Sequence, residues 1–266
     1  MSGIIGGTGA RSGVIGETEI QRFTTNYDRP GDGHYDVDSY TKLLVQSDTT
    51  NNSTTFVDSS SYGHALTRSN QAAHSTGHAV IGGSSIEFDG ANDTVNVAAS
   101  ANLALGSSDW TIDFWFFPAA VSRMWLFSGT QDHNTALAYG HQSSAGETTG
   151  KLEAWSSSNG SAWNHMGDGA SGRGQGQAGR LKNGVWQHLA VVREADVWKI
   201  FCNGELDMIA MSSGAITSEQ TNGFNIGSHG GHGGSYGTHG WIDEFRMSVG
   251  IARWTGPFRV YPKDEF

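Results

Sequence analysis

The sequence predicts an all-β protein built as a two-sheet antiparallel sandwich. Short runs of alternating apolar and polar residues, rich in β-branched and aromatic side chains, recur along the 266-residue chain, whereas helical periodicity is almost absent. The chain has 38 glycines against 4 prolines, and glycine-rich turns between such runs are typical of an all-β protein. A chain of this length can bury its core as a single domain.

The first predicted pair of strands lies on either side of a tight turn. Ile86 and Phe88 share one face of an alternating run, residues 89–93 supply turn-forming Asp, Gly and Asn, and Val95 and Val97 then alternate again. We therefore expect two short strands with their apolar side chains turned to the same core.

The segment 110–118 predicts a strand that is buried on both faces. Trp110, Ile112, Phe114 and Phe116 fall on one face, and the opposite face also becomes apolar toward the end of the segment. Such a pattern is expected of a strand inside a two-layer sandwich.

The clearest hairpin joins residues 186–193 to residues 197–202 through a short turn. Asn203-Gly204 then supplies the two residues with positive φ that a type I′ turn requires. Three strands are therefore expected to follow one another with almost no loop.

A late strand is predicted at residues 241–246, directly after a run of Gly and His residues. Strict alternation places Trp241, Asp243 and Phe245 on one face and Ile242, Glu244 and Arg246 on the other.

Composition narrows the function classes. The formal net charge of −10, with only 16% charged residues, argues against nucleic acid as a partner.

Cys202 is the single cysteine and cannot form an internal disulfide. No apolar run approaches the roughly 18 residues of a membrane helix, and the start of the chain lacks a basic n-region, so we expect neither membrane insertion nor a secretion signal.

Five ordered segments carry a resemblance to a known family: FVDSSSYGHALT, SSIEFDGANDTVNV, WTIDFWFFP, VWQHLAVVREADVWKIFCNGE and GWIDEFRMSVGIARWTGPF. They resemble laminin G-like, concanavalin A-like jelly-roll domains, especially those of bacteriophage structural and tail-associated proteins. The resemblance covers about residues 40–262 and implies a jelly roll of two antiparallel sheets. It departs from the phage pattern at the first strand, where Gln46 and Ser47 replace a His-Phe pair.

A fold of this kind does not define an activity, so any catalysis has to follow from particular residues. Glycoside hydrolysis needs two carboxyl groups on either side of one bond, and the Glu-x-Asp-x-x-Glu pattern of related glucanases does not occur. Asp243 and Glu244 are adjacent and are expected to face opposite sides of a strand. We therefore expect no enzymatic activity, and a polysaccharide-degrading enzyme is the least favoured alternative.

The histidine-rich run at residues 226–246 raises the question of a metal site. His229, His232 and His239 could converge on zinc or nickel, but a loop made mostly of Gly and Ser lacks the rigid supporting partners of such sites. The favoured interpretation is a displayed surface loop, with no metal and no cofactor, and calcium is left open.

Four residues are candidates for glycan binding: Trp155, Trp163, Tyr236 and His239. The tryptophans stand among Ser and Asn residues, and aromatic rings flanked by amides and hydroxyls suit sugars. The alternative is that both tryptophans are core residues of strands.

The N-terminus repeats Ser-Gly followed by two β-branched residues, which places Ile4, Ile5, Val14 and Ile15 among glycines. We expect residues 1–22 to form an arm that docks into a neighbouring subunit, residues 23–39 to link it, and residues 40–266 to form the jelly roll. The alternative is an arm packed on its own domain.

Together these features favour a bacteriophage virion protein, displayed on the surface of the tail or capsid and forming a homo-oligomer, for which a trimer is possible. Its jelly roll would be a tail-fibre or tail-associated adhesin that binds host surface polysaccharide, with other virion proteins as partners of the arm. The alternative is a decoration or cement protein of the capsid or neck with a purely structural role.

Overall fold

The computed structural model describes residues 35–130, 135–139, 151–166, 173–216, 223–229 and 236–260, and over these ranges it confirms the two-sheet, all-β sandwich. The docking residues Ile4, Ile5, Val14 and Ile15 lie outside the described residues, as does His232.

The described residues form one eight-stranded antiparallel sheet, in the order β13-β12-β11-β6-β15-β4-β3, with β1 paired to the second half of β15. The bounds of these strands are Thr41–Val45 (β1), Ala73–Ser75 (β3), Ser85–Asp89 (β4), Trp110–Pro118 (β6), Gln187–Glu194 (β11), Val197–Cys202 (β12), Glu205–Met211 (β13) and His239–Val249 (β15).

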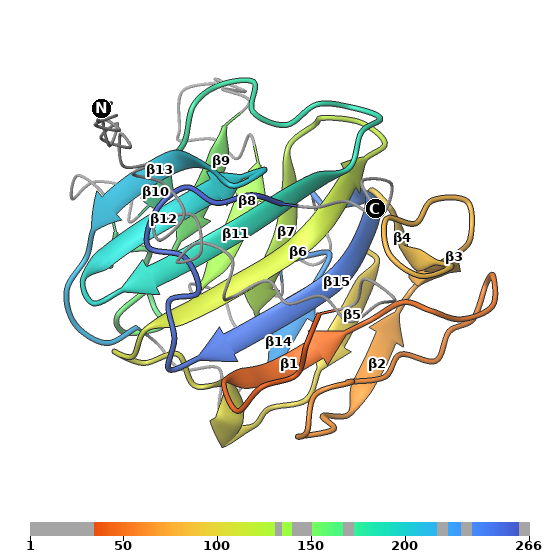
Figure 1. The fold of residues 1–266 in the computed structure, drawn as a ribbon, viewed down its shortest axis with the longest axis horizontal. Helices are drawn as coiled ribbons and strands as arrows, with labels where there is room; N and C mark the ends of the chain where they lie inside the picture. Colours follow the sequence, from red (N-terminus) through yellow and green to blue (C-terminus); the bar gives the residue numbers. More distant parts are fainter. Residues whose placement is uncertain are drawn as a thin grey trace, which may run out of the picture.

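The second sheet of the described chain has seven strands, in the order β10-β9-β8-β7-β14-β5-β2. Their bounds are Leu66–Ser69 (β2), Thr94–Val97 (β5), Met124–Gly129 (β7), Ala136–Tyr139 (β8), Leu152–Trp155 (β9), Arg173–Gln175 (β10) and Phe224–Ile226 (β14). A single 3-10 turn, Ala101–Leu103, follows β5. Figure 1 shows the eight-stranded sheet in front of the seven-stranded one.

The main core lies between the two sheets. The face predicted for residues 110–118 is confirmed, because Trp110, Ile112, Phe114 and Phe116 all belong to this core and are fully buried. Phe114 contacts Phe127 of the opposite sheet with ring centroids 6.1 Å apart. The edge-to-face geometry of this pair joins the two layers.

The predicted hairpin is also confirmed. β11 pairs with β12 from Leu189 opposite Cys202 to Glu194 opposite Val197. Asn203 and Gly204 have φ of 52° and 75°, as a type I′ turn requires. A side chain at Gly204 would also collide with the carbonyl oxygen of Phe258, so glycine is needed there for space as well as for backbone conformation.

The strict alternation predicted for residues 241–246 is wrong. The register with β6 shifts between Asp243 and Arg246, and Glu244 has a φ of 50°, which marks a β-bulge. The extra residue moves Phe245 to the face of Ile242, and both lie in the core between the sheets. Trp241 and Asp243 therefore do not share a face with Phe245.

The outer face of the eight-stranded sheet is covered by chain segments that return over it. Tyr35, Val80 and Ile81 form a buried cluster with Leu44 and Trp115 of the sheet. A second cluster places Trp254 and Phe258 over Ala190, Val192 and Phe201.

An ionic network lies between these coverings. Both guanidinium nitrogens Nε and Nη2 of Arg246 donate to the Asp113 carboxylate at 3.0 Å, and the Tyr35 ring stacks on the same guanidinium at 4.0 Å. His188 lies 3.4 Å from Asp113 and 3.0 Å from the Tyr35 hydroxyl. Asp38 pairs with Arg253 at 2.9 Å, so residues predicted as linker pack on this face.

Candidate functional site

The outer face of the seven-stranded sheet carries a cluster of tryptophans. Along β9, Leu152 and Ala154 point into the core, so Glu153 and Trp155 point outward. Trp125 of β7 points outward in the same way.

Small residues on the intervening strand make room for the indole rings. Trp125 lies opposite Ala138 across the β7–β8 pair, and Trp155 lies opposite Ala136 across the β8–β9 pair. Directly opposed side chains on a sheet are close neighbours, and alanine leaves the space above β8 open to the rings on either side.

Trp163, from the segment after β9, completes the group. Its ring stacks on Trp125 with a centroid distance of 6.0 Å and an interplanar angle of 16°. It meets Trp155 edge to face at 5.4 Å, and Trp125 and Trp155 are 5.9 Å apart. Trp125 is fully buried and Trp155 is 6% exposed, whereas Trp163 is half-buried. We call these three residues the tryptophan cluster.

The loop that carries Trp163 is held by hydrogen bonds between its own residues. The Ser157 hydroxyl accepts hydrogen bonds from the amides of Asn159 and Gly160 at 3.2 and 2.9 Å. Asn164 accepts from the amide and hydroxyl of Ser158. Such side-chain turns order a loop without regular strands, and Asn159 and Asn164 are exposed residues of the loop that carries Trp163.

Of the four residues predicted to bind glycan, two lie in the tryptophan cluster and two lie outside it. Trp155 and Trp163 come together, neither of them in the core between the sheets. Tyr236 is exposed at 42%. Its carbonyl accepts from the Trp125 amide at 2.8 Å, while its ring packs under the Arg123 guanidinium at 3.7 Å. His239 begins β15 opposite Asp89.

His229 adds an imidazole ring to the tryptophan cluster. Its ring centroid lies 4.4 Å from that of Trp125 and 5.7 Å from that of Trp163. The residue is 1% exposed. The sequence pattern raised His229 only as a metal ligand. Among the described residues, no three His, Cys, Asp or Glu side chains are grouped so that they could hold a metal ion.

The prediction that Asp243 and Glu244 face opposite sides of the strand is wrong. The bulge turns both carboxylates toward the buried cluster on the outer face, where Asp243 accepts from the amides of Val80 and Ile81 and Glu244 accepts from the Tyr35 amide. Burial, together with the neighbouring charge of Glu244, raises the pKa of Asp243 well above its ordinary value. The two acids are nevertheless 1% and 0% exposed, so a polysaccharide cannot reach them.

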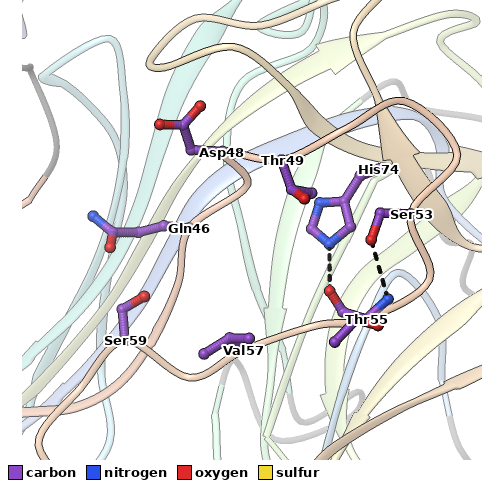
Figure 2. Close-up of a pocket in the computed structure, with 8 residues that line it drawn as sticks. All are labelled: Gln46, Asp48, Thr49, Ser53, Thr55, Val57, Ser59 and His74. Carbon is purple, nitrogen blue, oxygen red and sulfur yellow. Dashed lines mark hydrogen bonds between the residues drawn. The ribbon is translucent and has the colours of Figure 1, made fainter.

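A polar pocket of about 400 Å³ lies beside β1 and β3 of the eight-stranded sheet. Figure 2 shows the residues that line it, which come from the segment after β1, the following loop and β3: Gln46, Asp48, Thr49, Ser53, Thr55, Val57, Ser59 and His74. The sequence drew attention to this region only through the unusual Gln46 and Ser47.

The described part of the chain contains no helix with the length and hydropathy needed to span a membrane.

Comparisons with known proteins agree with this architecture. Residues 89–249 match the concanavalin A-like lectin/glucanases superfamily, and no curated protein sequence matches the chain. Domain 4 of AbnA, an extracellular arabinanase from Geobacillus stearothermophilus solved with arabinotriose, is similar at a TM-score of 0.54 and 16% identity, over 80% of this chain and 93% of that one. The binding domain of botulinum neurotoxin serotype D is similar at a TM-score of 0.53 and 11% identity, over 79% of this chain and 48% of that one.

The binding domain of botulinum neurotoxin DC, solved with SialylT, is similar to the same degree, with a TM-score of 0.53, 11% identity and the same 79% and 48% coverage. This chain thus spans about half the length of the neurotoxin chains, and identities this low show the fold alone. Because the family match extends over more than half of its residues, the chain belongs to the concanavalin A-like lectin/glucanases superfamily.

Proposed function

We propose that this protein is a glycan-binding module whose binding surface is the tryptophan cluster on the outer face of the seven-stranded sheet. The observation that carries the proposal is the position of Trp125, Trp155 and Trp163 outside the main core, with Trp163 half-buried at the surface.

The chemistry of the cluster suits a sugar. An indole face covers the apolar C–H groups of a pyranose or furanose ring, and neighbouring amides can both donate to and accept from its hydroxyls. Asn159 and Asn164 are exposed residues of the loop that carries Trp163. Because Trp163 is stacked on Trp125, its ring is held in place before a ligand arrives, which lowers the entropic cost of binding.

The similar structures support this proposal. One was solved with arabinotriose, and a neurotoxin binding domain, about half of which is similar to this chain, was solved with SialylT. We propose binding without hydrolysis because the adjacent carboxylates of Asp243 and Glu244 are buried and cannot contact a polysaccharide.

The test is binding of the protein to a glycan array and to purified bacterial surface polysaccharides. Trp163→Ala is expected to reduce the affinity at least tenfold, since loss of a stacking aromatic at the centre of a site commonly costs more than about 1.4 kcal/mol. Trp241→Ala is the matched control, because Trp241 is also half-buried but lies on the eight-stranded sheet. Equal affinity of the two variants would contradict the proposal.

We further propose that the module is displayed on the surface of a bacteriophage particle as a tail-fibre or tail-associated adhesin. The resemblance of the five sequence segments to those of phage structural proteins supports this role, and so does the Gly/Ile-rich N-terminus. Residues 1–22, with Ile4, Ile5, Val14 and Ile15, would dock to other virion proteins or a second copy in a homo-oligomer.

Deletion of residues 1–22 tests the docking role. The truncated protein is expected to keep its melting temperature and its glycan binding but to be absent from assembled particles. Normal incorporation of the truncated protein into particles would contradict the docking role of residues 1–22. Incorporation that depends on the arm, in a protein that binds no polysaccharide, would favour a capsid or neck decoration protein instead.

A further inference from the structure

We propose that the polar pocket beside β1 is a second ligand site, which takes one neutral sugar residue or a polyol of similar size. This site belongs to the eight-stranded sheet, whereas the tryptophan cluster lies on the outer face of the seven-stranded sheet. The two sites share no residue, so the second stands independently of the proposed function.

The pocket is built by a loop whose two ends are fixed. At one end the amide of Asn52 donates to the His74 carbonyl at 2.7 Å, and the His74 amide donates to the Ser53 carbonyl at 2.9 Å. At the other end the Ser59 amide donates to the Leu44 carbonyl at 2.7 Å. The Leu44 amide in turn donates to the Asp58 carboxylate at 3.0 Å. Because both ends of the loop are held by hydrogen bonds, this open pocket exists before a ligand binds, as ligand pockets usually do.

His74 forms a neutral side of the pocket. Its Nε2 lies 2.9 Å from the Thr55 carbonyl, which can only accept, so Nε2 carries the proton. Nδ1 then accepts from the Ser47 hydroxyl at 2.6 Å. Burial lowers the pKa of His74 against the opposing hydrogen bond to Thr55, which keeps the ring uncharged at neutral pH.

The Ser47–His74 pair has the geometry of a nucleophile and its base, but Ser47 is fully buried. A substrate therefore cannot reach its hydroxyl. The pair holds the pocket together rather than performing a reaction. His74 is further fixed by stacking on Phe56 at 4.6 Å.

The lining groups select the class of ligand. Thr49, Ser53, Thr55 and Ser59 supply hydroxyl groups, and each hydroxyl can donate or accept, which matches the adjacent hydroxyls of a sugar. Val57, 60% exposed, offers methyl groups to a C–H face.

Charge narrows this class further. Asp48 is the one charged side chain among the lining residues of the pocket, all of which lie in the described chain. Its carboxylate is fixed by the Gly83 amide at 3.0 Å. None of the lining residues is cationic, so an anionic ligand such as a phosphate, sulfate or uronate finds no opposite charge among them. A volume of about 400 Å³ falls near the lower end of the range for ligand sites, which fits one sugar residue.

The test is an amide NMR titration of the full chain with D-glucose, D-galactose, L-arabinose and glycerol, and with D-glucuronate for comparison. At least one neutral ligand is expected to shift the amide signals of Thr49, Ser59 and Gly83 saturably, with a dissociation constant on the order of 1 mM. Glucuronate is expected to bind several-fold more weakly than glucose.

Variants then locate the binding. Ser59→Phe fills the pocket and should abolish the shifts, whereas Ser61→Phe, at an exposed position outside the pocket, should preserve them. Thr49→Val keeps the side-chain shape and removes one hydroxyl, so a roughly three- to tenfold weaker affinity is expected. It carries the test alone if Ser59→Phe does not fold.

Trp163→Ala should leave these shifts unchanged, which separates this site from the tryptophan cluster. The proposal is overturned if no neutral ligand gives saturable shifts, if the shifts persist in folded Ser59→Phe, or if glucuronate binds more tightly than the neutral sugars.

Discussion

The outer face of the eight-stranded sheet is covered by the chain itself. The outer face of the seven-stranded sheet carries the tryptophan cluster, in which Trp163 is only half-buried. Under the first covering lies an ionic network, in which Asp113 and Arg246 are 0% and 3% exposed. The second face has aromatic rings above the alanines of β8.

This difference indicates how the two faces are used. A buried charge is tolerated only where its partners are fixed, so the network on the first face requires that the segments around Tyr35 and Trp254 stay in place. An aromatic face that is partly open has no such requirement, and the half-buried ring of Trp163 lies at its surface. The covered face therefore stabilises the fold, and the aromatic face is the one to which we assign the proposed recognition.

The largest expected effect comes from breaking the ionic network. Asp113→Ala leaves the Arg246 guanidinium buried without the carboxylate that accepts two of its hydrogen bonds. We expect the free energy of unfolding to fall by about 3–5 kcal/mol in urea denaturation. Asp36→Ala, at an exposed position, is the control and should stay within about 0.5 kcal/mol of the parent protein. A loss below about 1 kcal/mol for Asp113→Ala would contradict the structural role of the network.

The same network predicts a dependence of stability on acid. Burial alone would raise the pKa of Asp113, but Arg246 and His188 hold it at about 2, below its ordinary value of 3.8. Because the pKa is lowered on folding, the stabilisation is present above the unfolded value and is lost as the pH falls toward the folded one. Between about pH 5 and pH 2 the parent protein should lose on the order of 2 kcal/mol relative to Asp113→Asn. Parallel stability curves for the two proteins would contradict this assignment.

Asp243 should show the opposite sign. Its pKa is raised by burial and by Glu244, so its contribution to stability is present at low pH and is lost as the pH rises through the folded value. Asp243→Asn removes the titration, and the parent protein should become less stable relative to this variant as the pH rises from the ordinary value of 3.8 through the raised folded value. Denaturation curves collected across that range measure the difference. A parent protein that gains stability relative to Asp243→Asn as the pH rises would contradict the raised pKa of Asp243.

Much of the fold is predictable from local patterns, because alternation and turn chemistry are local properties. The strand at residues 110–118 and the turn at Asn203 and Gly204 follow from their own residues. The bulge at Glu244 does not, because alternation assumes two residues per repeat and the extra residue is set by pairing with β6 and β4.

The candidate sites show the same limit. Trp155 and Trp163 stand out among polar residues, but Trp125 lies in the apolar first four residues of β7, where no alternation separates an outward ring from an inward one. Its place in the cluster depends on pairing with β8. The polar pocket likewise depends on the bonding of Asn52 and Ser53 to His74, more than twenty residues away.

The smallest expected effect on stability belongs to Trp163, and it sharpens the contrast between the two faces. Trp163→Ala removes a half-buried ring from the edge of the cluster, so the free energy of unfolding should fall by only about 1 kcal/mol. Trp198→Ala, which removes a fully buried ring from the main core, should cost about 3–5 kcal/mol. Thermal and urea denaturation of both variants give the comparison. If Trp163→Ala costs as much as Trp198→Ala, the ring is a structural support, because a recognition residue on an open face contributes to binding more than to folding.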